Sequence, residues 1–188
     1  MLGLSGIGLA LTPFILNHLK SYQRDRLTIF LNPHSDPLGA GHNVIQSTIT
    51  IGSGQVFGRG LAAGSQSQLN FLPSLAQHTD FIFAVLNEKM GFVGGTLLLG
   101  LFGILLYRGL RIAYTAQDRF GLFLSVGVSA MILFHVFINA GMNMGIAPVT
   151  GIPLPFVSYG GTALIVAMAS LGMLESVVAR RKKLQFEG

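Results

Sequence analysis

The sequence predicts an all-α polytopic membrane protein, with about three full transmembrane helices, a partial one at the N-terminus and a large extracytoplasmic loop. The 188 residues are 51% hydrophobic and only 10% charged, whereas soluble domains carry about 25% charged residues. The stretch from Phe120 to Leu174 holds no Asp, Glu, Lys or Arg. That stretch is too long for a single crossing, which takes about 20 residues, so it must fold back once.

The apolar runs, the turns and the charges divide the chain into successive segments. The first run, from Leu2 to Leu16, is shorter than a full span, so we interpret it as the tail of a membrane helix that lacks its start. The predicted segments are a partial transmembrane helix (1–16), a large extracytoplasmic loop (17–90), a transmembrane helix (91–107), a cytoplasmic loop (108–119), a transmembrane helix (120–143), an extracytoplasmic Pro/Gly loop (144–159), a transmembrane helix (160–179) and a basic cytoplasmic tail (180–188).

The orientation follows from the basic residues, because short loops rich in Lys and Arg stay on the cytoplasmic side. The connection from Arg108 to Arg119 and the tail from Arg180 to Lys183 are both basic and lie two crossings apart. The large loop and the Pro/Gly loop therefore share the outer face. Two runs inside the large loop, 27–31 and 44–51, fit short helices or short strands equally well.

Composition also excludes some functions. Cysteine is absent, which rules out disulfides and thiolate metal sites. The net charge of +5 comes from dispersed cations without aromatic stacking motifs, so we expect no nucleic-acid partner.

Asp80 is the main candidate for chemistry. It follows the long polar loop and directly precedes the apolar run from Phe81 to Leu86, where a carboxylate is costly unless something uses it. Thr79 is predicted to be a helix N-cap. Two interpretations then stay open: an acid stabilised by the start of a helix, or a general base that accepts a proton from a hydroxyl group.

Polar residues and glycines inside the predicted spans give weaker signals. His135, Asn139 and Asn143 are four residues apart, which places them on one helical face. Such groups either bond to a neighbouring helix or line a cavity. Gly91 and Gly95 have the spacing that lets another helix approach closely.

Two loop motifs have an ordinary structural interpretation. The glycine-rich run GSGQVFGRG at 52–60 lacks the features of a phosphate loop, which favours plain turns over backbone amides that cradle an anion. Ser158 and Tyr159 open the last span after a stretch stiffened by Pro153 and Pro155.

Two longer strings, taken together, are more specific. One is GSQSQLNFLP at 64–73, followed by HTDFIFA at 78–84; the other is PVTGIPLPFVSYGG at 148–161. With YQRDR at 22–26, they resemble the SEDS family of bacterial cell-wall proteins, named for shape, elongation, division and sporulation. The residues of these motifs resemble those of the rod-shape branch of the family more than those of the division branch. Members have about ten helices, so this chain is similar to their C-terminal part only.

The resemblance implies a peptidoglycan glycosyltransferase of the bacterial inner membrane, with a cytoplasmic C-terminus and a role in cell elongation and shape maintenance. Its substrate would be lipid II, and its partner a class B penicillin-binding protein, with membrane lipids around both. The family's essential loop aspartate maps onto Asp80. Transfer from undecaprenyl pyrophosphate would invert the anomeric carbon. A lipid II flippase and an inactive fragment or scaffold of the cell-wall synthesis complex are the alternatives.

The same resemblance suggests residues that would bind substrate. Leaving pyrophosphate needs cations, for which basic side chains of the outer loop, or a divalent ion such as Mg²⁺ or Mn²⁺, are candidates. No cluster of metal ligands is visible in the sequence, so no metal-binding residue is proposed. The candidates for substrate binding are Arg24, Arg26, Arg59, His78, Gln66, Ser158 and Tyr159.

Overall fold

The computed structural model describes residues 20–36, 39–60 and 79–183, and every regular element in these ranges is helical. In chain order they are α2 (Ser21–Leu31), the short 3-10 helix η1 (Pro33–Ser35), α3 (Ala40–Ser53), α6 (Ile82–Tyr114), α7 (Arg119–Asn143) and α8 (Gly161–Lys183). The predicted all-α polytopic class is confirmed, because Ile82–Tyr114, Arg119–Asn143 and Gly161–Arg180 are each long and apolar enough to cross a membrane. The predicted partial helix at 1–16 lies outside the described residues.

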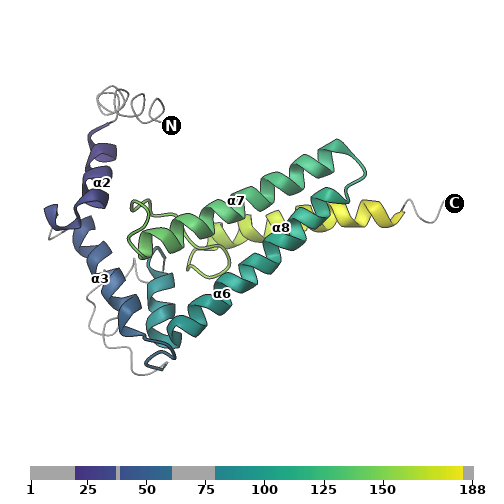
Figure 1. Ribbon diagram of the computed structural model, residues 1–188. Helices are drawn as coiled ribbons and strands as arrows, with labels where there is room; N and C mark the ends of the chain where they lie inside the picture. Colours follow the sequence, from purple (N-terminus) through teal and green to yellow (C-terminus); the bar gives the residue numbers. More distant parts are fainter. Residues whose placement is uncertain (1–19, 37–38, 61–78, 184–188) are drawn as a thin grey trace, which may run out of the picture.

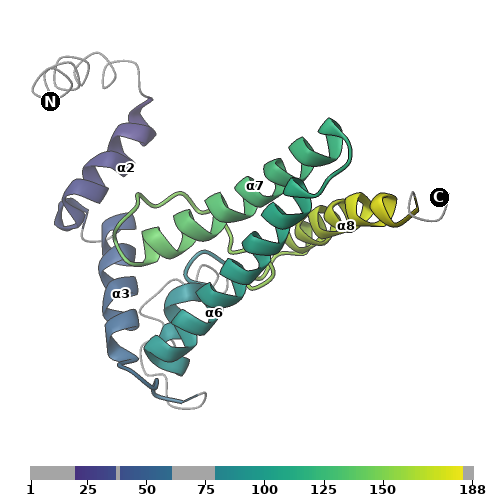
Figure 2. The same cartoon turned by 45° about the vertical axis from the view of Figure 1, so that its right-hand side comes forward.

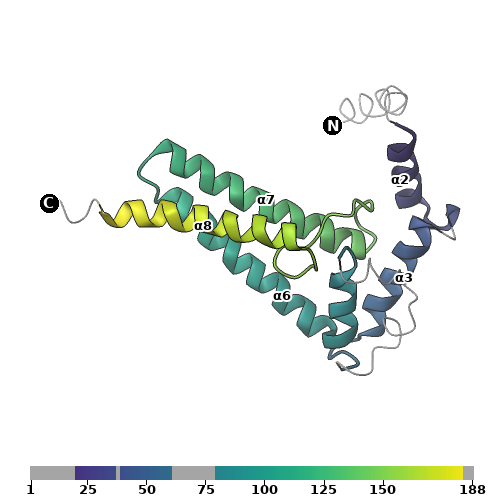
Figure 3. The ribbon, with the colours of Figure 1, turned by 180° about the vertical axis from the view of Figure 1, so that it is seen from behind.

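The three long helices form one bundle, and the two shorter helices lie across one end of it (Figure 1). α6 and α7 pack along each other, and α8 packs against both. Figure 3, the view from behind, shows α8 lying along the α6–α7 pair. α3 contacts α6 and the end of α7, as the turned view in Figure 2 also shows. The start of α6 and the end of α7 therefore meet beside α3.

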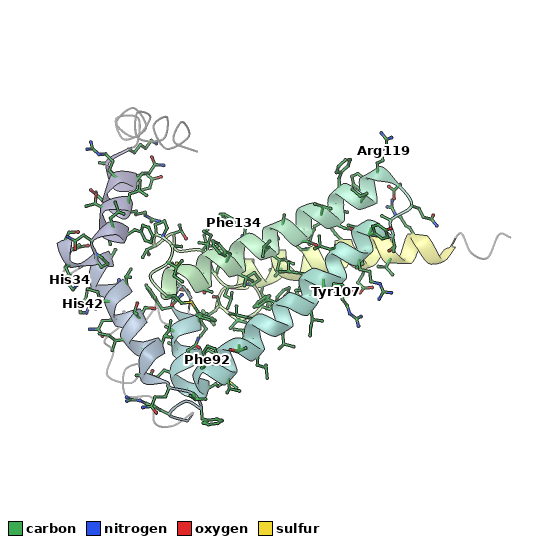
Figure 4. The ribbon with its side chains drawn as sticks, viewed as in Figure 1. His34, His42, Phe92, Tyr107, Arg119 and Phe134 are labelled. Atoms are coloured by element: carbon green, nitrogen blue, oxygen red, sulfur yellow. The ribbon has the colours of Figure 1, made fainter. Side chains whose placement is uncertain are left out.

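α7 shows how the sequence produces this packing. The carboxylate of Asp118 accepts a hydrogen bond from the amide of Gly121 at 3.1 Å, which caps the first turn. Buried positions then recur every three or four residues, as expected for one face of a helix. The hydrophobic core of the bundle consists of Phe102, Val128, Ile132, Val136, Leu154 and Leu174. On the opposite face, Phe134 points away from the bundle (Figure 4).

α6 is broken at Gly91, where φ is 67° and ψ is −168°. The segment after α3 supplies the backbone partners that the break removes. The amide of Phe92 donates to the carbonyl of Gln55 at 2.8 Å, and that of Arg59 donates to the carbonyl of Glu88 at 3.0 Å. The main chain of Val56 and Gly58 passes where a Cβ on Gly91 would lie. Only glycine fits this conformation and this close approach.

The break corrects one prediction about the glycines. Gly91 and Gly95 are both buried within the chain itself, Gly91 by the 56–58 segment and Gly95 by the side chain of Asn87. They are therefore not an open face for the close approach of another helix. The amides of Arg59 and Gly60 donate to carbonyls of α6, which favours the turn interpretation of the glycine-rich run over an anion cradle.

The observed helices also differ in extent from the segments read from the sequence. The run at 27–31 belongs to α2, and the run at 44–51 belongs to α3, so both are helical. α6 begins at Ile82 rather than near residue 91 and continues to Tyr114. Asn87, Glu88 and Lys89 lower the hydropathy before Gly91, so the apolar pattern alone starts the span too late. Where the membrane begins and ends along these helices stays a prediction.

Candidate active site around Asp80

Asp80 lies in a turn immediately before α6, at the end of the bundle that α3 covers. Asp80 is partly buried rather than fully enclosed in the protein. The predicted role of Thr79 as helix N-cap is wrong, because the N-cap of α6 is Phe81 and no side chain caps it. The turn formed by Thr79, Asp80 and Phe81 is held instead by residues far away in the sequence.

Two asparagines on α7 hold the main chain of Asp80. The side-chain amide nitrogens of Asn139 and Asn143 donate to the Asp80 carbonyl oxygen at 3.1 Å and 3.0 Å, respectively. Both asparagines have an exposed fraction of 0%. Buried amides of this kind cost free energy unless they are hydrogen-bonded, so the contact ties the position of Asp80 to the end of α7.

Two serines complete this arrangement. The hydroxyl of Ser158 donates to the carbonyl of Thr79 at 2.6 Å and accepts from the amide of Leu154 at 2.7 Å. The hydroxyl of Ser47 on α3 lies 3.0 Å from both the carbonyl and the side-chain oxygen of Asn143. We call Ser47, Asn139, Asn143 and Ser158 the clasp. It connects α3, α7 and the Pro/Gly loop to the turn before α6.

Ser47 was missed from the sequence alone. A signal for it exists, because the buried residues Gly41, Val44, Ser47 and Thr50 recur every three positions along α3. A small hydroxyl within such a buried stripe suggests a hydrogen bond to a neighbouring helix. The partner, Asn143, lies 96 residues away, and nothing in the local pattern names it.

The carboxylate of Asp80 faces the Pro/Gly loop. A Cβ built on Gly151 would lie 3.4 Å from Oδ2 of Asp80, and this oxygen is the nearest atom to that position. Within the described ranges, no hydrogen-bond donor reaches the carboxylate. Its oxygens can therefore accept a proton from a molecule that enters beside Gly151.

The predicted cations are divided between two places. Arg26 lies beside the Asp80 site, because its guanidinium donates to the carbonyl of Val149 at 2.7 Å and lies 5.9 Å from the ring centre of Tyr22. Arg24, on the same helix, is exposed. Arg59 lies near the Gly91 break, where its Nε donates to the carbonyl of Ser53 at 3.0 Å. The structure does not bring it into contact with Asp80.

The structure does not bring the other predicted residues that it describes into contact with Asp80. Tyr159 is 81% exposed. His135 does not join the clasp and instead lines a groove of about 240 Å³ between α7 and α8, together with Pro155 and Thr162. His78 and Gln66 lie outside the described residues. Among the residues that the structure describes, no three His, Asp or Glu side chains gather as a metal site.

The two ends of the bundle differ in charge. Tyr107 and Arg119 lie at the end opposite to His34 and His42 of the α2–α3 corner (Figure 4). Arg108 and Arg111 on α6 line a groove with Glu175 of α8 near the Tyr107 end. Asp80 and the clasp are at the other end, a full span away from these arginines.

This arrangement defines a multi-pass helical membrane protein with one acidic side chain held at the end of its bundle. The chain belongs to the family of cell cycle proteins described by FtsW, RodA and SpoVE, whose model matches residues 1–183.

Its relatives include enzymes named for cell-wall synthesis. The chain is 53% identical over 171 residues to the peptidoglycan glycosyltransferase MrdB of Escherichia coli K12, covering 91% of this chain and 45% of that protein. It is 50% identical to the peptidoglycan glycosyltransferase RodA of Treponema pallidum, covering 87% of this chain and 37% of the relative. Against stage V sporulation protein E of Bacillus subtilis, the identity is 47%, and 94% of this chain and 46% of the relative are covered. The chain thus spans less than half the length of these relatives.

A solved structure has the same fold. That structure is described as the structural coordination of polymerization and crosslinking by a peptidoglycan synthase complex. The TM-score is 0.68 at 34% identity, covering 92% of this chain and 46% of the solved one.

Proposed function

We propose that the whole protein is a peptidoglycan glycosyltransferase that polymerises lipid II for cell elongation and shape maintenance. The observation that carries this proposal is the partly buried Asp80, whose carboxylate faces Gly151 and whose main chain the clasp holds at one end of the spanning bundle. Relatives named as peptidoglycan glycosyltransferases support the chemistry. Because this chain covers less than half of them, the activity belongs to the whole protein.

In this mechanism, Asp80 acts as a general base. Its carboxylate accepts the proton of the GlcNAc 4-hydroxyl of one lipid II as that oxygen attacks the anomeric carbon of the growing glycan. The bond from that carbon to undecaprenyl pyrophosphate breaks on the opposite face, so the configuration inverts. The pyrophosphate leaves with the electron pair of the broken bond.

The charge that develops on the pyrophosphate needs neighbouring cations. Arg26 is placed best among the predicted cations, because it contacts the same loop that faces Asp80. Arg24 lies two residues before Arg26 on α2. A divalent ion such as Mg²⁺ or Mn²⁺, held together with substrate phosphates, would supply the same stabilisation.

The orientation and partner are part of the proposal. Arg108, Arg111 and Arg119 at one end of the bundle support a cytoplasmic placement of that end and of the C-terminus, which leaves Asp80 on the outer face of the inner membrane. A class B penicillin-binding protein is the expected partner, and the similar solved complex supports this.

A lipid II flippase is less well supported, because a transporter needs polar groups through the depth of the membrane. The buried hydroxyls of Ser129 and Ser170 within the spans donate to carbonyls of their own helices. Lipid transport by proteoliposomes without any glycan product would favour the flippase.

The proposal is tested with the full-length protein, its partner and purified lipid II. We expect Asp80→Asn to lower the rate of glycan polymerisation by about 10²–10⁴-fold, the usual contribution of a general base. Asp25→Asn is the matched control, since Asp25 is an exposed acid on α2 of the same outer region. Polymerisation by the Asp80 variant at the rate of the control would refute the proposed role.

A further inference from the structure

The loop that faces Asp80 comes close to the carboxylate at Gly151. This residue has φ of +72°, a left-handed conformation that disfavours side chains. Its missing Cβ would lie 3.4 Å from Oδ2 of Asp80 and in contact with no nearer atom. The bare Cα of Gly151 therefore forms one wall of the space in front of the carboxylate.

This wall is fixed at both ends. On one side, the guanidinium of Arg26 donates to the carbonyl of Val149 at 2.7 Å. On the other side, the amide nitrogen of Asn139 donates to the carbonyl of Ile152 at 2.8 Å. The loop is thus held next to Asp80 by two side chains from different helices.

Asn139 also connects this wall directly to Asp80. Its side-chain nitrogen donates to the carbonyl of Asp80 at 3.1 Å as well as to that of Ile152. An amide NH₂ group has two hydrogens at a fixed angle, so one planar group sets the spacing between the two backbones. Because Asn139 is fully buried, water does not compete for either bond.

We propose that Gly151 is an access-determining residue: the absence of a side chain leaves Oδ2 of Asp80 open to the attacking hydroxyl, across a gap whose width Asn139 sets. This inference rests on the proposed function of Asp80 as general base. A hydroxyl must come within about 2.5–3.0 Å of the carboxylate oxygen to donate its proton. A methyl group on residue 151 would already be in van der Waals contact with that oxygen, so it would close the approach from the loop side.

The chain provides a matched control for the conformational strain. Gly145 lies in the same loop and has the same φ of +72°. The nearest atoms to its missing Cβ are Thr48 Oγ1 and Val44 Cγ1, both at 3.8 Å. Gly145→Ala therefore introduces the same left-handed strain as Gly151→Ala without filling space beside Asp80.

The experiment compares both alanine variants in the full-length protein with its partner, at equal amounts of folded protein. We expect kcat for lipid II polymerisation to fall by about 10- to 100-fold in Gly151→Ala, with a much smaller change in KM. The reason is that displacing the attacking hydroxyl slows the chemical step more than it weakens substrate binding. Gly145→Ala should stay close to the wild type. Wild-type activity of both variants would show that a side chain at residue 151 does not block access, and an equal loss in both would show strain alone. Either result would overturn the inference.

A second variant covers the case in which Gly151→Ala does not fold. Asn139→Asp keeps the shape of the side chain but removes both donors, which releases the loop from Asp80. We expect the same fall in kcat, and an unchanged kcat would contradict the inference. If Asp80→Asn is inactive while Gly151→Ala and Gly145→Ala are equally active, only the role of Gly151 fails. If Asp80→Asn is active, the proposed function itself fails.

Discussion

The side-chain amide of Asn143 donates a hydrogen bond to the main-chain carbonyl of Asp80 at 3.0 Å, across 63 residues of sequence. The same nitrogen donates to the carbonyl of Asn139 at 2.8 Å. The side-chain oxygen of Asn143 accepts a hydrogen bond from the hydroxyl of Ser47. A single buried side chain thus connects α3, α7 and the turn before α6. Substitutions at the end of α7 should therefore affect Asp80 without touching the carboxylate.

The first prediction concerns Asn143. Asn143→Ala removes two donated bonds and one accepted bond at a site with no exposure, so the hydroxyl of Ser47 loses its side-chain acceptor. We expect the free energy of unfolding of the full-length protein to fall by about 1–3 kcal/mol, the cost of buried polar groups left unsatisfied. Polymerisation should fall as well. Thermal unfolding in detergent and the lipid II assay measure the two effects.

Ser125→Ala is the matched control for Asn143. Ser125 is a fully buried polar residue on the same helix, and within the described part of the chain its hydroxyl has no hydrogen-bond partner. Removing it should leave stability and polymerisation close to the wild type. If both variants behaved alike, the clasp would have no measurable role.

The second prediction concerns the break in α6. Gly91→Ala forces a side chain into the left-handed region, which costs about 1–2 kcal/mol, and the passing backbone of Val56 and Gly58 adds a steric conflict. We therefore expect a marked fall in the thermal unfolding temperature. Gly103→Ala, in the same helix with open space around its missing Cβ, should be neutral or stabilise by up to about 1 kcal/mol. The reverse order of the two variants would rule out the break as the structure describes it.

The third prediction separates the two arginines of α2. Arg26→Gln removes the charged donor that holds the carbonyl of Val149, whereas Arg24→Gln changes an exposed side chain on the same helix. We expect the Arg26 variant to lower the rate of polymerisation by about 3- to 10-fold, the range of one hydrogen bond to a charged group reduced by solvent. The Arg24 variant should be closer to the wild type. An equal loss in both would point to the summed positive charge of α2 rather than to the contact with Val149.

The amino-acid sequence predicts the spanning helices well, because few backbone conformations are stable in the interior of a membrane. Backbone amides and carbonyls in lipid must be paired inside the segment, so an apolar run of sufficient length becomes a helix. The uncharged stretch from Phe120 to Leu174 therefore predicts a helix, a turn and a second helix, as α7 and α8 show. The predicted start of α6 was less accurate, because the polar residues Asn87 and Glu88 are buried, next to the segment after α3, rather than exposed at a membrane surface.

The candidate site was only partly predictable. The position of Asp80 between a polar loop and an apolar run singles it out, and the four-residue spacing places Asn139 and Asn143 on one face of α7. The same spacing wrongly groups His135 with them, since His135 lines the groove toward α8. The buried stripe of α3 suggests a hydrogen bond from Ser47 but does not specify its partner. Gly151 carried no local signal for a contact with this site.

The sequence by itself determined the helical membrane architecture, the family and the acid most suited to chemistry, because apolar length, charge placement and short motifs are local properties. Only the tertiary structure decided what surrounds that acid. The long-range bonds of the clasp join residues 59 to 96 positions apart, and their partners are determined by how α3, α7 and the Pro/Gly loop pack. A buried polar group must find a partner wherever packing provides one, and no local pattern specifies which residue that will be.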